Sequence, residues 1–184
     1  RRVHLSLFNC ANRFVPGDRG FLLYGRPGSG KTHLLSAFIR RISLEKGIQA
    51  RFIEFTHLLS QLRSQFDAGR GDTSVIRPLI DVEVVAIDEL GKGVNNEWQL
   101  SVLDELISKR YNLGRTTVFT SNYLLEPEQF SYHDVATDKI KRASNETLSE
   151  RVGERIFSRL FEMTDFIELD APDYRKRKLK LVES

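Results

Sequence analysis

The chain has 184 residues, 40% of them hydrophobic and 29% charged, with a formal net charge of +3. This length and balance predict a single soluble domain with a sizeable core. The apolar runs are too short to span a bilayer, and the net charge is too small to identify a nucleic-acid binder. The single cysteine, Cys10, suits a reducing cytoplasm, and we expect it to be buried. Because the chain lacks an initiator methionine, we expect it to be part of a longer protein.

The first predicted strand is Phe21–Tyr24, which runs directly into the glycine-rich sequence GRPGSGKT, residues 25–32. A helix is predicted over Thr32–Lys46, because apolar residues recur there at helical spacing. Two glycines at fixed spacing, followed by lysine and threonine, are typical of a phosphate-binding loop between a strand and a helix.

The chemistry of this loop follows from its residue types. Gly28 and Gly30 allow the backbone to curl tightly and turn its N–H groups toward one anion. The positive end of the following helix lies at the same place. Lys31 is expected to reach the β- and γ-phosphates of a nucleotide, and the Thr32 hydroxyl to bind Mg²⁺. The other expected nucleotide contacts are Gly25, Arg26, Pro27, Ser29 and His33. The alternative, a surface turn beside a lysine, fits the flanking strand and helix poorly.

A second strand is predicted over Ala50–Phe55. Thr56 then caps a helix that runs through Phe66 and stops near Gly69 and Gly71.

An acidic pair, Asp88 and Glu89, follows the almost continuously apolar strand Val82–Ile87. Such a strand is expected to be covered on both faces, and ligands of open parallel sheets bind at the carboxyl ends of the strands. We expect Asp88 to hold Mg²⁺ through water, and Glu89 to orient and deprotonate the attacking water. The alternative is a solvated turn.

Asn95 or Asn96 is expected to cap the next helix, which ends at Gly114. Its predicted apolar face consists of Trp98, Val102, Leu103, Leu106 and Ile107. Strand Thr116–Thr120 follows, and Asn122 comes just after it. If this strand lies between the two strands already described, Asn122 faces the γ-phosphate and positions the water. Local chemistry alone favours a simpler interpretation, in which Asn122 starts a turn with its own backbone.

The C-terminal part predicts a polar loop over Ser131–Asn145, a helix over Leu148–Met163 and a last strand over Phe166–Leu169. One face of this helix carries an arginine at every fourth position: Arg151, Arg155 and Arg159. These side chains could be solvated and paired as Arg151–Glu154 and Arg159–Glu162. Alternatively, one of them stabilises phosphoryl-transfer charge in a neighbouring subunit. Spacing leaves both interpretations open.

Strands separated by helices predict an α/β fold, a mostly parallel sheet with helices on both faces. Four segments in this order resemble an AAA+ ATPase of the P-loop class: GRPGSGKT, VVAIDEL, TTVFTSN and SERVGERIFSRLFEM. The last segment, with the nearby PDYRKRK, resembles the DnaC/IstB family of bacterial helicase loaders and transposition helper ATPases. The resemblance covers residues 21–176.

This resemblance implies ATP and Mg²⁺ as cofactors and gives roles to individual residues. Those that match the two Walker motifs are Lys31, Thr32, Asp88 and Glu89. Asn122 matches the sensor-1 polar residue, which overturns the simpler interpretation of it as a turn residue. Arg159 matches the arginine finger, and Arg155 is expected to be an accessory contact.

Two departures from AAA+ proteins in general bear on domain organisation. Only residues 170–184 follow the last strand, too few for a helical lid domain, and loaders of this family similarly lack that lid. We therefore expect an ATP-binding core over residues 1–170 and a basic tail over residues 171–184. Nothing before Phe14 is expected to form the N-terminal partner-binding segment that family members carry.

Residues 56–78 take the place of a helical element that faces single-stranded DNA in related loaders and initiators. This segment offers Phe66 as a stacking platform, together with Arg63, Arg70 and Arg77. Equally, Phe66 could belong to the core and the arginines could be solvated. The basic run at residues 175–180 could bind phosphates, although a solvated terminal charge run is the commoner explanation.

The sequence therefore predicts a cytoplasmic ATPase that loads a replicative helicase and assembles head to tail on single-stranded DNA, each Arg159 reaching the next subunit's site. The runner-up is a transposition helper ATPase, which engages duplex DNA and a transposase. A small-molecule kinase and a degenerate nucleotide-binding scaffold are more distant alternatives.

Overall fold

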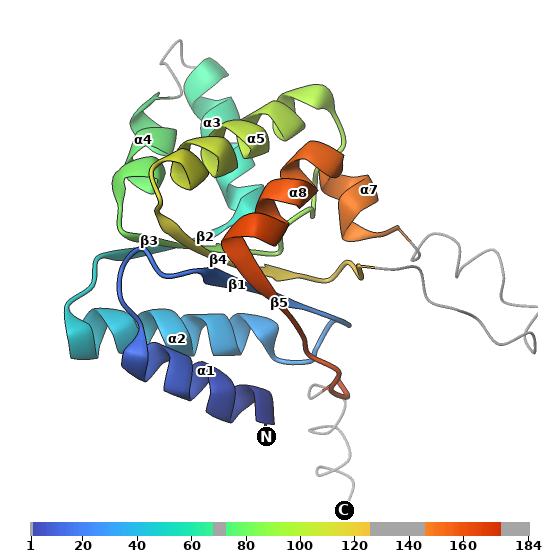
Figure 1. Ribbon diagram of the computed structural model, residues 1–184. Helices are drawn as coiled ribbons and strands as arrows, with labels where there is room; N and C mark the ends of the chain where they lie inside the picture. Colours follow the sequence, from blue (N-terminus) through green and yellow to red (C-terminus); the bar gives the residue numbers. More distant parts are fainter. Residues whose placement is uncertain (1, 68–72, 126–145, 174–184) are drawn as a thin grey trace, which may run out of the picture.

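A single sheet of five parallel strands organises the protein, and helices cover both of its faces (Figure 1). The computed structural model describes residues 2–67, 73–125 and 146–173. The strands are β1 Gly20–Tyr24, β2 Ala50–Glu54, β3 Val84–Asp88, β4 Thr116–Ser121 and β5 Thr164–Glu168. Their order across the sheet is β2-β3-β4-β1-β5. The predicted parallel α/β architecture is therefore confirmed.

The helices lie in two layers. Helices α1 and α2 cover one face of the sheet, and the remaining helices cover the other (Figure 1). The bounds are α1 Arg2–Arg13, α2 Lys31–Lys46, α3 Phe55–Asp67, α4 Thr73–Asp81, α5 Glu97–Asn112, α7 Leu148–Val152 and α8 Glu154–Met163. No helix within the described ranges is both long and apolar enough to cross a membrane.

Side chains of β1 alternate between two hydrophobic cores. Phe21 and Leu23 belong to the core beneath α1 and α2, and Leu22 belongs to the core beneath the other helices. This alternation follows from the period of two in a β-strand. Because both faces are covered, β1 is apolar along its length, and its carboxyl end holds the loop that follows at a fixed place.

Helix α1 is one of two helices that the sequence analysis missed. Leu7 and Ala11 are buried in the core shared with α2, and Phe14 packs edge-on against Phe38, with ring centroids 5.4 Å apart. Their spacing of four and three residues is a helical signal that could have found it. Cys10 lies on this helix and is exposed, so the expectation that it is buried was wrong.

Two local expectations need correction, and two others are not tested by the structure. Helix α3 begins at Phe55, which is fully buried, so Thr56 lies inside the helix and does not cap it. A separate helix, α4, was not predicted; it contains Pro78, a residue that usually ends helices. The predicted end of α3 near Gly69 and Gly71 lies outside the described residues, as does the predicted loop over residues 131–145.

Two residues, Asn96 and Gly153, set boundaries of the helices in the C-terminal half of the chain. Asn96 caps α5, because its side chain accepts a hydrogen bond of 3.0 Å from the backbone N–H of Gln99. The helix predicted over Leu148–Met163 is in fact two helices, broken at Gly153. Gly153 has a φ of 81° and a ψ of 150°, a conformation that interrupts helical hydrogen bonding and favours glycine.

Arg110 is a fully buried arginine on α5, on a helix face that is otherwise apolar. Its guanidinium donates to the carbonyl oxygens of Leu79 at 2.6 Å, Val82 at 2.9 Å and Thr116 at 2.5 Å, and to the Thr117 hydroxyl at 2.8 Å. These bonds join α5 to the end of α4 and to β4. The side chain therefore replaces apolar packing with a satisfied polar cluster.

We expect Arg110→Ala to lower the free energy of unfolding by about 3 kcal/mol, because it leaves a cavity and several buried carbonyl groups without their donor. Urea denaturation followed by circular dichroism measures the change. The matched control on the same helix is Lys109→Ala, which removes an exposed pair with Glu105 and should cost about 0.5 kcal/mol or less. Equal losses for the two variants would contradict a structural role for Arg110.

Candidate nucleotide-binding and hydrolysis site

The loop over residues 25–32 joins β1 to α2 and has the backbone that its glycines predict. Gly28 and Gly30 have φ values of 80° and 96°, in the left-handed region that side chains other than glycine rarely adopt. Gly30 is the N-cap of α2, so the first N–H groups of that helix lie at the loop. The loop therefore presents backbone donors and a helix N-terminus at one place, as an anion site requires.

Lys31 is buried within this loop, with only 5% of its surface exposed. Its ammonium donates hydrogen bonds to the carbonyl oxygens of Gly25 and Arg26, both at 2.8 Å, and to the Ser29 hydroxyl at 3.3 Å. The loop therefore holds the charge at its own centre. A nucleotide phosphate bound at this position could accept the hydrogen bonds that the Lys31 ammonium now donates to the loop.

Asp88, at the end of β3, lies beside the first turn of α2. Its Oδ1 accepts a hydrogen bond of 3.1 Å from the Thr32 hydroxyl and another from the Thr120 hydroxyl of β4. Asp88 is 6% exposed and Thr120 is 1% exposed, so packing and hydrogen bonding fix the carboxylate. The structure thus brings together Thr32 and Asp88, the two residues predicted to hold a metal.

A hydroxyl and a carboxylate at this spacing suit Mg²⁺, which takes few protein ligands and completes its shell with water and substrate phosphates. Within the described parts of the chain, no group of three His, Cys, Asp or Glu side chains could hold a metal alone. The donor set therefore fits a magnesium ion carried by a nucleotide better than a dedicated metal centre.

Glu89 follows Asp88 with a φ of 56°, and no other described residue except glycine has a positive φ. Its N–H donates to the Thr120 hydroxyl at 3.0 Å, which holds this conformation. Its carboxylate accepts a hydrogen bond from Lys92, which lies 3.8 Å from Glu54 of β2. The hydrogen bond to Glu89 and its charge raise the pKa of Lys92 above its ordinary value. The stabilising ion pair is therefore present at neutral pH and is lost only as the pH rises through the raised pKa.

Asn122 follows the end of β4, the strand between β3 and β1. The register pairs Tyr24 with Ser121, so Asn122 and Gly25 leave the sheet side by side. Asn122 is half-buried. The predicted position of Asn122 depended on β4 lying between β3 and β1, and the sheet has this strand order.

The arginines do not lie on one face, because Gly153 places Arg151 on α7 and the other two on α8. The pairs with Glu154 and Glu162, which one of the two interpretations proposed, are not formed, because the arginines pair with Glu146 and Asp104 instead. Arg159 donates to Asp104 at 2.7 Å and to the Ser108 hydroxyl at 2.6 Å, and the Arg155 guanidinium lies 3.1 Å from the other oxygen of Asp104. Both arginines therefore share one carboxylate on α5. Arg155 remains 72% exposed and Arg159 25% exposed.

Several residues around the site were missed by sequence reasoning. Lys92 and Thr120 fix the two acidic residues, and Asp104 holds the two arginines. Their signal is weak, because a lysine after an acidic pair or an aspartate in a helix usually indicates only a solvated surface. The carboxylate of Asp173 also lies against Gly28, a contact between segments far apart in the sequence.

Lys31→Ala is expected to abolish nucleotide binding, because the loop then loses the buried charge that neutralises the phosphates. Titration with a fluorescent ATP analogue would measure the affinity. The control is Lys46→Ala at the far end of the same helix, which should bind ATP normally. Retained affinity in Lys31→Ala would contradict the assignment of the loop.

A parallel sheet, a glycine loop between β1 and α2 and an acidic pair at the end of β3 define a P-loop protein of the AAA+ class. Comparison of the sequence with known families identifies the family within this class. The chain matches the family described as IstB-like ATP binding protein over residues 5–180, and it belongs to that family.

Relatives within this class include replicative helicase loaders. The chain is 25% identical over 124 residues to the replicative helicase loader DnaC of Buchnera aphidicola subsp. Baizongia pistaciae, covering 66% of this chain and 50% of the relative. It is 24% identical over 107 residues to DnaC of Escherichia coli strain K12, covering 58% of this chain and 43% of the relative. It thus spans at most about half the length of these relatives.

Solved structures show the same fold. The crystal structure of the DnaC helicase loader matches with a TM-score of 0.74 and 28% identity, covering 92% of this chain and 89% of that one. The replication initiator DnaA bound to AMPPCP and single-stranded DNA matches with a TM-score of 0.68 and 16% identity, covering 100% of this chain and 51% of that one. The second likeness concerns the fold alone.

Proposed function

We propose that this chain is an ATP-hydrolysing AAA+ domain of a replicative helicase loader, which assembles head to tail on single-stranded DNA. The observation that carries the ATPase assignment is the hydrogen bond of 3.1 Å from the Thr32 hydroxyl to Oδ1 of Asp88, beside the buried Lys31. Two elements distant in sequence, the start of α2 and the end of β3, converge there with the donors that a magnesium nucleotide requires.

Each of these residues has a separate role in the proposed binding and hydrolysis of ATP. Lys31 and the backbone of the loop bind the phosphates, and Thr32 and Asp88 hold Mg²⁺, which neutralises developing charge when bound. Glu89 acts as the general base once Lys92 releases its carboxylate. Asn122 positions the attacking water. Arg159 reaches the site of the next subunit, and Arg155 supports it.

A loader is favoured over a transposition helper because relatives of this chain are named replicative helicase loaders. The family description, IstB-like ATP binding protein, keeps the helper as the second candidate. The two differ in the nucleic acid expected to stimulate them: single-stranded DNA for a loader and duplex DNA for a helper.

A DNA contact is proposed on the side of α3. Arg63 of α3 and Trp98 at the start of α5 line one open cavity of about 600 Å³. Trp98 was predicted to be part of the apolar core face, but it is 39% exposed. A cation and an exposed aromatic ring are the groups that bind single strands by charge and stacking. Arg77 is exposed and lies 3.5 Å from Asp81, whereas Arg70, the side chain of Phe66 and the basic run at residues 175–180 lie outside the described parts.

The test is ATP hydrolysis as a function of protein concentration, with single-stranded DNA, with duplex DNA and without DNA. The proposal predicts specific activity that climbs with concentration and climbs further on single-stranded DNA. Stimulation by duplex DNA alone would favour the transposition helper. Flat specific activity, indifferent to DNA, would contradict assembly and favour the kinase alternative.

A further inference from the structure

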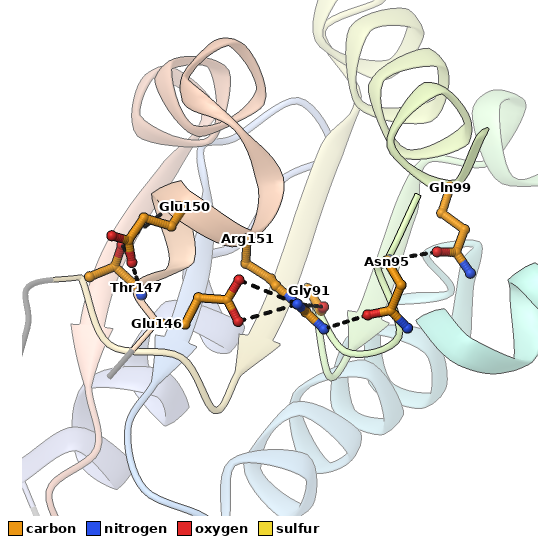
Figure 2. A network of polar contacts seen from close by, with 7 residues as sticks. All are labelled: Gly91, Asn95, Gln99, Glu146, Thr147, Glu150 and Arg151. Carbon is orange, nitrogen blue, oxygen red and sulfur yellow. Dashed lines mark hydrogen bonds and ion pairs between the residues drawn. The ribbon is translucent and has the colours of Figure 1, made fainter. Parts of the chain in front are cut away.

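Arg151 of α7 is the centre of a polar network that joins two separate parts of the chain (Figure 2). Its Nε donates to the carbonyl oxygen of Gly91 at 3.0 Å, and its Nη2 donates to Asn95 at 3.0 Å. Its Nη1 forms an ion pair of 3.2 Å with Glu146. The guanidinium carbon also lies 5.5 Å from the ring centroid of Tyr123.

The loop that Arg151 holds begins at the proposed general base. Glu89, Gly91 and Gly93 have φ values of 56°, 88° and 76°, so the backbone takes left-handed conformations at three positions out of five. For Glu89 this conformation is unfavourable and persists only where the surroundings enforce it. A loop of this kind therefore needs anchors on both sides.

The first anchor comes from β4. The Thr120 hydroxyl accepts a hydrogen bond of 3.0 Å from the backbone N–H of Glu89. The Thr120 carbonyl oxygen accepts another, of 2.8 Å, from the backbone N–H of Leu90. The second anchor is Arg151. Gly91 is packed between it and Tyr123: a Cβ on Gly91 would lie 3.1 Å from Cγ of Arg151 and 3.2 Å from the Tyr123 ring.

We propose that Arg151 is a positioning residue, which clamps the loop between Gly91 and Asn95 so that Glu89 is held in its working conformation. The side chain is 20% exposed and divides its three nitrogens among the loop, Asn95 and Glu146. It is therefore committed within its own subunit, unlike the largely exposed Arg155. The clamp extends the proposed hydrolysis function and rests on it.

The first experiment compares hydrolysis by Arg151→Ala with that of Arg40→Ala, an exposed arginine on α2 remote from the site. At saturating ATP and protein, we expect kcat of Arg151→Ala to fall by about 10- to 100-fold, with ATP affinity unchanged. Arg151→Lys keeps a charge for Glu146 but not the planar fork, so it should not restore kcat. Full rescue by lysine, or an unchanged kcat in Arg151→Ala, would overturn the proposal.

The second experiment needs no hydrolysis and so separates this proposal from the proposed function. Trp98 is the single tryptophan of the chain and lies three residues beyond Asn95, so its fluorescence reports on the loop. Acrylamide quenching of Trp98 should change in Arg151→Ala and Asn95→Ala but not in Arg40→Ala. Unchanged quenching would overturn the clamp. If the wild-type protein hydrolyses no ATP, the proposed function fails, and quenching alone decides whether Arg151 holds the loop.

A stability control completes the design, because Arg151→Ala could lower kcat by loosening the whole domain. Leu7→Ala removes a buried side chain from the core on the opposite face of the sheet. It should lower the free energy of unfolding, measured with urea, while leaving kcat unchanged. An equal fall in kcat for Leu7→Ala would overturn a specific role for Arg151.

Discussion

Arg159→Ala is expected to lower the rate of ATP hydrolysis by about 10³-fold or more, because an arginine finger stabilises charge that develops only in the transition state. ATP affinity should stay the same, because the loop that binds the phosphates is intact in each subunit. Single-turnover hydrolysis at high protein concentration measures the rate, and titration with a non-hydrolysable analogue measures the affinity.

The control for Arg159→Ala is Asp104→Asn. In the structure Asp104 accepts from Arg159 at 2.7 Å and also holds Arg155, so this substitution breaks the ion pairs but retains both arginines. We expect it to lose much less activity than Arg159→Ala. If the two variants are equally slow, or if Arg159→Ala affects only solubility, the arginines of α8 are structural.

Glu89→Gln is expected to slow hydrolysis by about 10²- to 10⁴-fold, because glutamine cannot take a proton from the attacking water. It should still bind ATP and accumulate in the assembled form. Rapid-quench hydrolysis gives the rate, and sedimentation in the presence of ATP gives the assembly state.

The matched control for this variant is Glu54→Gln, because both glutamates lie near Lys92 and both changes remove one negative charge. A hydrogen bond from Thr56 and the charge of Lys92 lower the pKa of Glu54, so it is charged at neutral pH and its removal is a fair comparison. We expect Glu54→Gln to keep most of the activity. Unchanged turnover in Glu89→Gln would remove Glu89 from the mechanism.

The sequence predicts the phosphate loop well because its backbone demands particular residues. Left-handed φ values at Gly28 and Gly30 require glycine, and this requirement is visible in the residue types. The covered strand before Asp88 is equally visible as an apolar run. The order of the strands in the sheet is not visible in the sequence, since it depends on how the connections cross the sheet. The position of Asn122 could therefore be predicted only on the assumption that its strand lies between the other two.

Side-chain partners across the site were the part that the sequence could not predict. Helical periodicity put three arginines on one face, but it applies only within a continuous helix, and Gly153 divides this one. A glycine in a helical pattern was the available signal for that break. The burial of Arg110 had no signal at all, because its partners are mainly backbone carbonyl groups of other elements.

The most direct test of the central claim, that active sites are completed between subunits, mixes two inactive variants. Arg159→Ala subunits keep an intact site but offer no finger, whereas Glu89→Gln subunits offer a finger but lack the base. Random head-to-tail assembly should pair a good site with a good finger at about one quarter of the interfaces. We therefore predict that an equal mixture regains about a quarter of the wild-type specific activity. A mixture as inactive as either variant alone would contradict the account.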